Sequence, residues 1–430
     1  MLKNKNIYLI PLLGFASIIL IGCLILMLPV CSNENVTLFD AAFTAVSATC
    51  VNGLTTVDIS QNYTFLGQLV IAIITEIGAI GFVTFISFIF NIKKKKMPLS
   101  ETLLLSSALN NSDYSKLKKR LKEVIKYTLV IELIGSIFLS IAFIPMFGIK
   151  YGIWYSIFYS ITAFCNAGFD LFGNSGFTIF AENIYINIVI VVLMFLGGIG
   201  FFVIEDLINC IQKKSFLHMR FHTKIVLVTT IIIYILSIIV IKITEPTLTF
   251  LQVLFTSVTI RTTGFSTINM SEINDITKML LSLFMMIGGA PGSTSGGIRI
   301  TSVAVIILVV HATLNNKKEV TIFFKKIDIQ TIKQAVTNIF ISNSIIIIAI
   351  IIFAKIQNIE LINIIFMCVS AFSATGLSVI DVGALLGFSK IILMLLMFIG
   401  RVGPISILSI FILNKKENKN IEYVSGNLML

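Results

Sequence analysis

The chain has 430 residues, a formal net charge of +11 and a mean hydropathy of +0.99, and only 12% of its residues are charged. In a soluble globular protein about a quarter of the residues are charged. The composition therefore excludes a soluble enzyme, a disordered protein and a secreted disulfide scaffold, and it predicts a protein that crosses a membrane several times. The positive charge lies in loops between apolar runs, so it does not indicate nucleic-acid binding.

Eight apolar runs are long enough to cross a bilayer, because about 20 helical residues span its hydrocarbon core. These runs cover residues 7–30, 66–92, 123–145, 183–211, 223–243, 276–312, 332–355 and 388–413. Between the two runs of each successive pair lies a segment too short to cross as a helix. The four short segments are 38–50, 152–165, 248–261 and 361–373.

Most lysines and arginines gather in five clusters at the ends of these pairs. The clusters are Lys3 with Lys5, 93–96 with 116–126, 213–224, 317–333 and 415–419. The positive-inside rule places all five clusters, and both termini, on the cytoplasmic side of the cell membrane. Consecutive clusters must then be joined by an even number of crossings. Each short segment is therefore expected to enter and leave by the same face, as a re-entrant loop.

The order of long run, short segment and long run occurs four times along the chain. The repeats are predicted at 1–97, 98–214 with a cytoplasmic linker, 215–318 with a broken second span, and 319–430 with a cytoplasmic tail. Each repeat crosses twice, so all four point the same way, and parallel repeats are related by an axis along the membrane normal. The expected fold is an all-α polytopic membrane protein, with eight transmembrane helices and four re-entrant loops around a central pore.

The four short segments share three registers. Each contains an aromatic residue, then a residue with a hydroxyl, and is followed within three residues by a glycine. The glycines are Gly53, Gly168, Gly264 and Gly376, the aromatics are Phe43, Phe158, Phe255 and Phe366, and the hydroxyls are Ser47, Thr162, Thr259 and Ser370. A later register reads Gly78-x-x-Gly81, Gly197-x-x-Gly200, Gly289-x-x-Gly292 and Gly400-x-x-Gly403. A single glycine in a membrane helix usually serves close packing, but recurrence in four copies indicates a common function.

The residues just before the four glycines include no carboxylate, so backbone carbonyls would have to coordinate a cation there. Rings of carbonyls replace the hydration shell of the ion in potassium filters, and helix C-termini aimed at the centre favour a cation. The expected ion-binding residues are Cys50, Val51, Asn52, Gly53, Cys165, Asn166, Ala167, Gly168, Thr262, Thr263, Gly264, Ser373, Ala374, Thr375 and Gly376.

These four degenerate loops, with one glycine each, resemble those of the Trk/Ktr/HKT superfamily of potassium transporters, and the resemblance covers almost the whole chain. Eight spans without an extra N-terminal pair look most like the Ktr-type ion-translocating subunit. The resemblance implies potassium uptake, commonly sodium-dependent, with no organic cofactor in this chain. It also implies a homodimer with one pore per subunit and a cytoplasmic regulatory subunit that binds nucleotide. Glycine in all four loops implies a preference for potassium over sodium.

A glycine-rich run interrupts the sixth apolar run and must break its helix. It consists of Gly288, Gly289, Ala290, Pro291, Gly292, Ser293, Thr294, Ser295, Gly296 and Gly297. The resemblance implies a flexible intramembrane gate loop, whereas the simpler alternative is a kink between two packed half-helices. Arg401 lies within the last run, where a charge usually faces the pore or a partner. We predict that Arg401 and the 288–297 loop form one gate; the alternative is a salt bridge to Glu76 or Glu132.

Three further features are interpreted more simply. Arg261 is expected to pair with an outer acid and to brace its loop. Glu205 and Asp206 are interpreted as an interfacial pair, and the six cysteines as free thiols that pack as small hydrophobic side chains. The first repeat departs from the family pattern at Glu76, where an amide is expected, and at Gly78-Ala79-Ile80-Gly81, which lacks the usual double glycine.

Two other functions were weighed against a potassium pore. A secondary carrier for a small organic solute also uses broken spans and glycine motifs, but such carriers more often bury acids at mid-membrane. An intramembrane enzyme would need a nucleophile and base, or metal ligands, at one depth. The sequence offers no such set: its three histidines do not cluster with carboxylates. The basic inner loops either dock a regulatory partner or serve only orientation and contact with anionic lipid.

Overall fold

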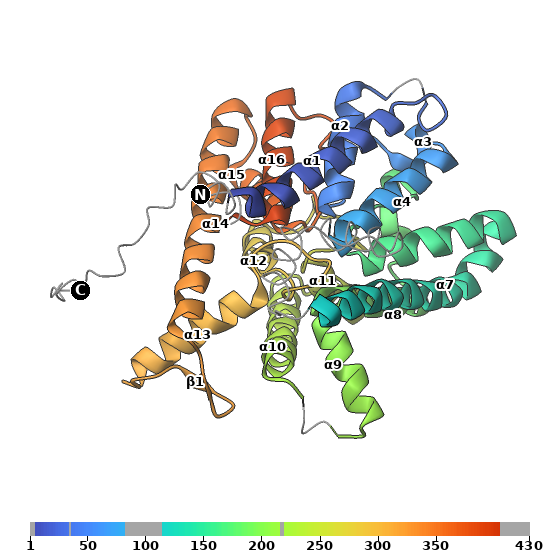
Figure 1. Ribbon diagram of the computed structural model, residues 1–430. Coiled ribbons are helices and arrows are strands. Elements are labelled where there is room, and N and C mark those ends of the chain that lie inside the picture. Colours follow the sequence, from blue (N-terminus) through green and yellow to red (C-terminus); the bar gives the residue numbers. More distant parts are fainter. Residues whose placement is uncertain (1–4, 34–35, 82–113, 216–218, 405–430) are drawn as a thin grey trace.

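The computed structural model describes residues 5–33, 36–81, 114–215 and 219–404 (Figure 1). In chain order its helices and strands are α1 (Lys5–Leu26), α2 (Leu38–Cys50), α3 (Ile59–Asn62), α4 (Phe65–Ile80), α7 (Tyr114–Phe164), the 3-10 helix η1 (Gly173–Phe180), α8 (Ile184–Ile199), α9 (Phe201–Gln212), α10 (Phe221–Thr244), α11 (Phe250–Thr259), α12 (Asp275–Met286), α13 (Ile300–Leu314), β1 (Thr321–Ile322), β2 (Lys325–Lys326), α14 (Ile329–Ile356), α15 (Leu361–Ser373) and α16 (Gly387–Val402). The two strands pair as a small antiparallel hairpin between α13 and α14. The predicted basic clusters at 93–96 and 415–419, and the last parts of the runs 66–92 and 388–413, lie outside the described residues.

The four short segments form helices, as predicted. Two of them, α2 and α15, have the predicted bounds, and α11 lies within the third segment. The remaining segment, predicted at 152–165, forms the last part of α7. This part follows a kink at Gly148, where φ is 78°. Capping boxes fix the starts of α2 and α11: the Thr37 and Thr249 hydroxyls each accept a backbone N–H three residues later, and Asp40 and Gln252 reciprocate.

The long apolar runs differ more from the prediction. Three described segments are each long and apolar enough to cross a membrane, namely Lys122–Phe164, which includes the kink, Phe221–Thr244 and Ile329–Ile356. The run 183–211 is not one straight span as predicted, because α8 and α9 bend by 103° at Gly200. The run 276–312 is divided into α12 and α13, and the non-helical stretch between them contains the predicted glycine-rich loop.

The second glycine of three G-x-x-G motifs ends a helix. Helices α4, α8 and α16 stop at Gly81, Gly200 and Gly403, where φ lies between 89° and 96°, a backbone conformation that favours glycine. In the same three motifs, a Cβ added at the first glycine would overlap a backbone carbonyl oxygen at the end of a short helix, on Thr49, Phe164 or Phe372. The motif therefore brings each long helix against the last turn of a short one and then ends it.

The helices form four groups that pack in a closed order (Figure 1). The groups are α1 with α2 and α4, α7 with α8, α10 with α11 and α12, and α14 with α15 and α16. Neighbouring groups meet through α4 and α7, α8 and α11, α12 and α15, and finally α16 and α2. The last contact joins the end of the described chain to its beginning, so the short helices surround a common centre.

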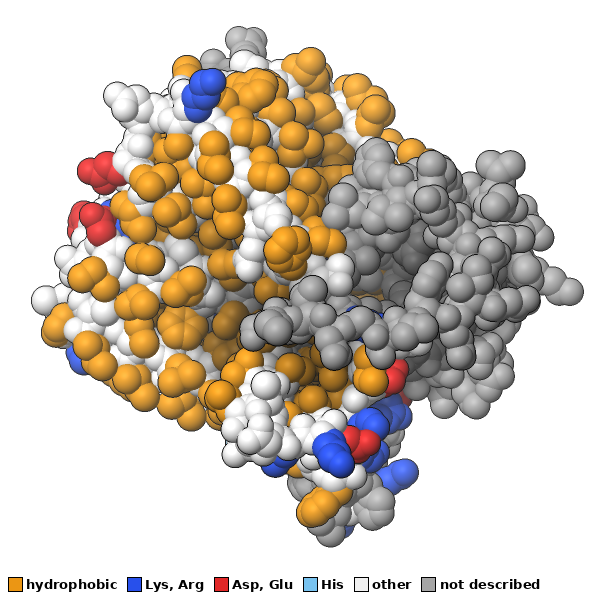
Figure 2. Space-filling view, turned by 90° about the vertical axis from the view of Figure 1, so that its left-hand side faces the viewer, with side chains coloured by type: hydrophobic (Ala, Val, Ile, Leu, Met, Phe, Trp, Pro, Cys, Tyr) orange, Lys and Arg blue, Asp and Glu red, His pale blue; other side chains and the backbone are white. Residues whose placement is uncertain are grey.

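The exterior of the protein is apolar over a broad face. Figure 2 shows hydrophobic side chains covering this face, with charged side chains gathered at its margins. Residues at least half exposed include Leu20, Ile141, Ile232 and Ile348, from four different helices. Such a surface in water would be a large aggregation site, whereas in a bilayer it faces lipid. The chain is therefore a membrane protein.

Candidate functional site

The four predicted loop glycines meet in a ring. A Cβ added at Gly53 would overlap the carbonyl oxygen of Ala167, and one at Gly168 would overlap that of Thr263. In the same way Gly264 lies against the carbonyl of Thr375, and Gly376 lies against that of Asn52. Each glycine thus contacts the residue before the glycine of the next segment, and the fourth segment returns to the first. All four glycines have positive φ, between 61° and 98°.

The side chains of the predicted ion-binding residues other than glycine are buried within the protein around this ring. In each segment the three residues before the glycine are buried, and only the glycine is partly exposed. For example, Asn52, Thr263 and Thr375 have no exposed surface. What the segments present to the central opening is therefore backbone, and a side chain at any of the four glycines would have to enter the neighbouring segment or the opening.

The backbone N–H groups of these segments are turned back into the short helices. In three segments a residue just past the helix, Val51, Asn166 or Ala374, has φ between 56° and 59°. The next N–H then bonds a helix carbonyl, as from Asn52 to Ser47 at 2.9 Å and from Thr375 to Ser370 at 2.9 Å. The third segment is one residue shorter, and Thr262 takes the positive φ, at 77°. The N–H of the residue before each ring glycine is thus occupied by a helix carbonyl.

Three of the four predicted hydroxyls brace the segments. Ser47 Oγ accepts the Gly53 N–H at 3.0 Å, and the Thr259 and Ser370 hydroxyls donate to the carbonyls of Phe265 and Leu377, each at 2.7 Å. The fourth, Thr162, donates instead to Phe158 O within its own helix, at 2.8 Å. In three of the four segments, therefore, the shared hydroxyl bonds the backbone of the ring glycine or of the residue that follows it.

Two asparagines that precede the ring glycines connect different segments. Asn52 Nδ2 donates to the carbonyls of Ser370 and Ala371, at 3.2 and 3.1 Å, which ties the first segment to α15. The Asn166 amide lies 2.8 Å from the Thr263 hydroxyl and 3.0 Å from that of Thr294. Asn166 therefore joins the second segment, the third segment and the glycine-rich loop.

The glycine-rich loop lies against the C-terminal ends of the short helices. The Thr294 hydroxyl donates to Phe164 O, the last residue of α7, and lies 3.2 Å from it. A Cβ added at Gly296 would lie 2.6 Å from the Cβ of Ala374. The loop is also held at its base, where Gly288 N bonds Ile298 O at 2.8 Å and Ile300 N bonds Gly289 O at 3.1 Å. Thr294 and Ser295 are each only 1% exposed, so the tip of the loop is packed against the ring segments.

Arg401 joins this loop to α4. Its guanidinium donates to the carbonyls of Thr294, of Gly78 at 2.5 Å and of Ala79 at 3.0 Å. The alternative salt bridge is not formed, because no ion pair links Arg401 to Glu76 or Glu132 in the described part of the chain. Arg299, which the sequence analysis did not single out, donates to Ser295 O at 2.8 Å and holds the same loop from its far side.

The prediction that Arg261 pairs with an outer acid is wrong. Its guanidinium donates to Gly288 O at 3.2 Å and lies 4.9 Å from the centre of the Tyr234 ring, and no described carboxylate pairs with it. The short helix α11 ends just before Arg261, so its side chain reaches toward the base of the glycine-rich loop. Glu205 and Asp206 do lie together, and both pair with Arg220, with N to O distances of 3.4 Å.

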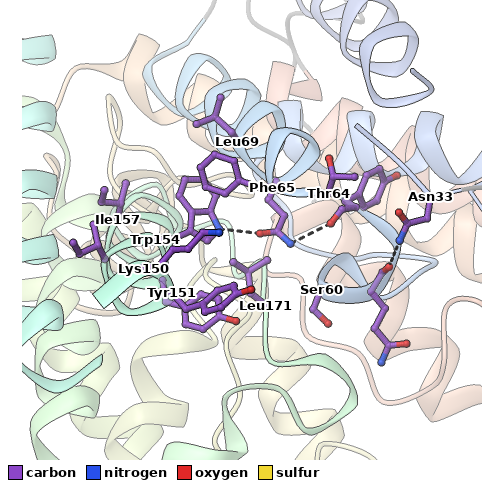
Figure 3. A pocket seen from close by; sticks show the side chains of 15 residues that line it. Asn33, Ser60, Thr64, Phe65, Leu69, Lys150, Tyr151, Trp154, Ile157 and Leu171 are labelled. Carbon is purple, nitrogen blue, oxygen red and sulfur yellow. Dashed lines mark hydrogen bonds between the residues drawn. The ribbon is translucent and has the colours of Figure 1, made fainter. Parts of the chain in front are cut away.

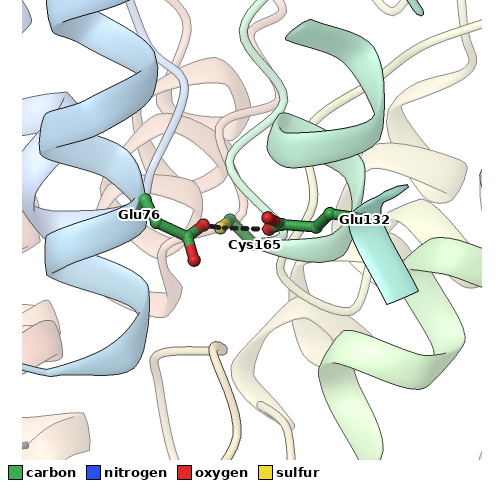
Figure 4. Close-up of side chains that lie close together, drawn as sticks. All are labelled: Glu76, Glu132 and Cys165. Atoms are coloured by element: carbon green, nitrogen blue, oxygen red, sulfur yellow. Dashed lines mark hydrogen bonds between the residues drawn. The ribbon is translucent and has the colours of Figure 1, made fainter. Parts of the chain in front are cut away.

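All six cysteines are free and buried, as predicted, but Cys165 has polar neighbours. Its Sγ lies 3.0 Å from Glu76 Oε2 and 3.7 Å from Glu132 Oε1 (Figure 4). Three potential metal-ligand atoms thus lie within 4.8 Å of one another, directly behind the second ring segment. The sequence analysis missed this cluster, because Glu76 and Cys165 are 89 positions apart.

An acidic cavity opens over Gly53 and Gly168. It has a volume of about 220 Å³, and its lining includes the side chains of Asp58, Asp170 and Asp381. Burial raises the pKa of the Asp170 carboxyl to about 6, against the opposing effect of the hydrogen bonds that it accepts from Tyr159 Oη and Phe172 N. The cavity can concentrate cations directly at the ring.

Comparisons with known proteins find relatives along nearly the whole chain. A family model named TrkH and described as "Cation transport protein" matches residues 15–423. The potassium/sodium uptake protein NtpJ of Enterococcus hirae is 34% identical over 97% of this chain and 95% of its own length. The Ktr system potassium uptake protein B of Bacillus subtilis has the same identity and coverage. The crystal structure of the potassium transporter TrkH from Vibrio parahaemolyticus matches the fold with a TM-score of 0.76 at 14% identity, over 95% of this chain and 85% of that one.

Proposed function

The chain belongs to the TrkH family of cation transport proteins, and we propose that it takes up potassium across the cell membrane through a filter of backbone carbonyls. The observation that carries this proposal is the ring in which each of four glycines lies against the carbonyl of the next segment. Curated relatives along nearly the whole chain are named for potassium or potassium/sodium uptake. Potassium is thus the cargo, and sodium is the candidate coupling ion.

The ring can replace the water around a monovalent cation. The four segments offer carbonyl oxygens and no side-chain charge at the opening, and the short helices point their C-terminal ends toward it. Carbonyl dipoles compensate for the lost hydration of a large monovalent ion, whereas they offer too little charge for a divalent one. The fifteen residues predicted from the sequence supply this backbone, and Gly53, Gly168, Gly264 and Gly376 line its opening.

The architecture proposed around this filter is four parallel repeats of span, re-entrant loop and span. Its support is the closed packing order of the four helix groups and the glycine motif that ends α4, α8 and α16 in the same way. In this arrangement the acidic cavity faces outward and the basic loops face the cytoplasm. The glycine-rich loop then obstructs the inner path below the filter, and Arg401 holds it there.

Two assembly features follow from the family alone. We propose a homodimer with one pore in each subunit, and a cytoplasmic nucleotide-binding subunit that docks on the basic inner loops. Opening would then require the partner to shift the glycine-rich loop away from the contacts that Arg401, Arg299 and Arg261 make with it.

The direct test is potassium uptake from low external potassium in cells that lack their own uptake systems. The chain is expressed with and without a candidate regulatory subunit, and the wild type is compared with Gly376→Ser. A serine there has to displace the Asn52 carbonyl and adopt a positive φ. Overpacking of about 1–3 kcal/mol corresponds to a loss of uptake of about tenfold or more.

Gly387→Ser is the matched control, because a Cβ at Gly387 meets nothing within 4 Å. This variant should keep wild-type uptake. If neither potassium nor sodium flux appears with any partner, in protein shown to be in the membrane, the filter proposal fails. A carrier of a small organic solute would then be the better explanation.

A further inference from the structure

A second pocket opens on the outside of the molecule, in the groove between α4 and the last part of α7 (Figure 3). Its volume is about 920 Å³, far more than an inorganic ion requires. The rings of Phe65 and Trp154 form its centre, with ring centroids 4.4 Å apart, and Trp154 Nε1 donates to Gln68 Oε1 at 2.8 Å. The pocket has no part in the ion path described above.

The lining divides into a polar end and an apolar end. Short polar side chains come from α3 and from the loops before α4, including Asn33, Ser60 and Thr64. The apolar end continues along the helices through Leu69 and Ile157, and Ile157 is 39% exposed. A ligand that fills both ends has to be an amphiphile, with a polar head and a hydrocarbon portion.

Among the described residues that line the pocket, Lys150 is the one that is charged. It is exposed, its Nζ lies 5.9 Å from the centre of the Tyr151 ring, and no described carboxylate forms an ion pair with it. The pocket therefore carries one positive charge without a described counter-ion, and it complements a negative head group.

The aromatic residues place this pocket at the surface of the bilayer. Tryptophan and tyrosine gather at the membrane–water boundary, where the ring meets lipid and the N–H or O–H meets polar groups. Trp154 and Tyr151 sit at this level, and Tyr151 is 57% exposed. Trp154 is also the only tryptophan in the chain.

We infer that this pocket binds an anionic phospholipid, whose phosphodiester lies at Lys150 and whose acyl chain follows Phe65, Leu69 and Ile157. The apolar floor and the volume distinguish this ligand from a free phosphate, and the unpaired lysine distinguishes it from a zwitterionic lipid. The site does not depend on which ion the chain carries, because it lies outside the ring.

Because Trp154 is the only tryptophan in the chain, its fluorescence reports on lipid in this pocket alone. The full chain is reconstituted in phosphatidylcholine vesicles, and Trp154 fluorescence is quenched with phosphatidylglycerol or phosphatidylcholine brominated on the acyl chains. One basic residue at a membrane surface corresponds to about a fivefold preference for an anionic lipid. Brominated phosphatidylglycerol should therefore quench at about one fifth of the mole fraction that brominated phosphatidylcholine requires.

Lys150→Gln should remove this preference while leaving quenching by both lipids, and Lys150→Arg should retain it. Lys355→Gln is the control, since it removes another exposed lysine, at the end of α14. Equal quenching by the two lipids in the wild type would overturn the inference, as would a preference that Lys150→Gln leaves intact. If neither lipid quenches Trp154, protein covers the groove. If added inorganic phosphate abolishes the preference for phosphatidylglycerol, the site binds phosphate alone. Each of these results rejects the lipid site.

Discussion

At the level of single residues, Asp170 beside the ring should make potassium uptake depend on pH. The Asp170 carboxyl, whose pKa burial raises to about 6, is neutral below that pH and negatively charged above it. A negative charge at the mouth raises the local concentration of cations. Uptake from low potassium and low ionic strength should therefore fall about two- to fivefold as the external pH is lowered from about 7 to about 5.

Asp170→Asn should remove the part of this pH dependence that is centred near pH 6, and it should lower uptake at neutral pH to the level that the wild type shows in acid. Glu360→Gln, which removes an exposed charge elsewhere, should leave the pH profile unchanged. The measurement is the initial rate of rubidium uptake against external pH. Identical profiles for the wild type and Asp170→Asn would exclude Asp170 as the titrating group.

A second prediction at this scale concerns Glu76, which stands where the resemblance led us to expect an amide. Glu76 and Glu132 both face Cys165 Sγ in a mostly buried cluster. Two carboxylates in such a place repel each other, and removing one charge while keeping its shape relieves that cost. Glu76→Gln retains an oxygen for the thiol, so the free energy of unfolding should rise by about 1 kcal/mol or more.

Thermal denaturation in detergent measures this effect, with the exposed acid variant Glu182→Gln as the control. Glu76→Gln should raise the denaturation temperature and Glu182→Gln should not. A lower denaturation temperature for Glu76→Gln would mean that its charge has a stabilising partner, such as a bound cation.

At the scale of elements, the glycine-rich loop between α12 and α13 is held by three arginines from different parts of the chain. Arg401 makes three hydrogen bonds, one to Thr294 in this loop and two to Gly78 and Ala79 in α4, so it ties the loop to that helix. A hydrogen bond from a charged group contributes about 1.5–3 kcal/mol. Arg401→Ala should therefore raise the open probability of single pores by about tenfold or more in the absence of a partner.

Arg401→Lys retains the charge but loses the forked geometry, so it should give an intermediate open probability. Arg220→Ala, which removes a guanidinium paired with Glu205 and Asp206, is the matched control. Single-channel recording in planar bilayers measures both open probability and conductance. If Arg401→Ala leaves both unchanged, Arg401 does not belong to the gate.

The short helices were the elements that the sequence predicted best. Their bounds follow from local chemistry: polar caps such as Thr37 start them, and the residues that take positive φ end them. The long helices were harder, because a glycine inside an apolar run is compatible with both a straight and a bent helix. The chain bends by 103° at Gly200, although the residues on both sides of it, from Ile184 to Ile204, are almost all apolar. Breaks of this kind are fixed by packing against the loop residues Pro291 and Gly292.

At the scale of the whole molecule, the ring depends on contacts between distant parts of the chain. Asn52 bonds Ser370, 318 positions away, and Arg401 bonds Gly78, 323 positions away. The recurring glycines predicted which residues share a role, because repeats preserve register. They could not predict which carbonyl each glycine contacts, nor that Arg261 faces the loop rather than an outer acid. Those contacts depend on how the four groups close on one another.

The central claim is that the four glycine-ended segments bind potassium in preference to sodium, independently of gate and partner. Isothermal titration of the purified chain with potassium and with sodium tests it most directly, because binding needs no open pore. The wild type should bind potassium at least about tenfold more tightly than sodium, and Gly376→Ser should lose that difference while Gly387→Ser keeps it. Equal affinities for the two ions in the wild type, or a potassium preference that survives Gly376→Ser, would contradict the account.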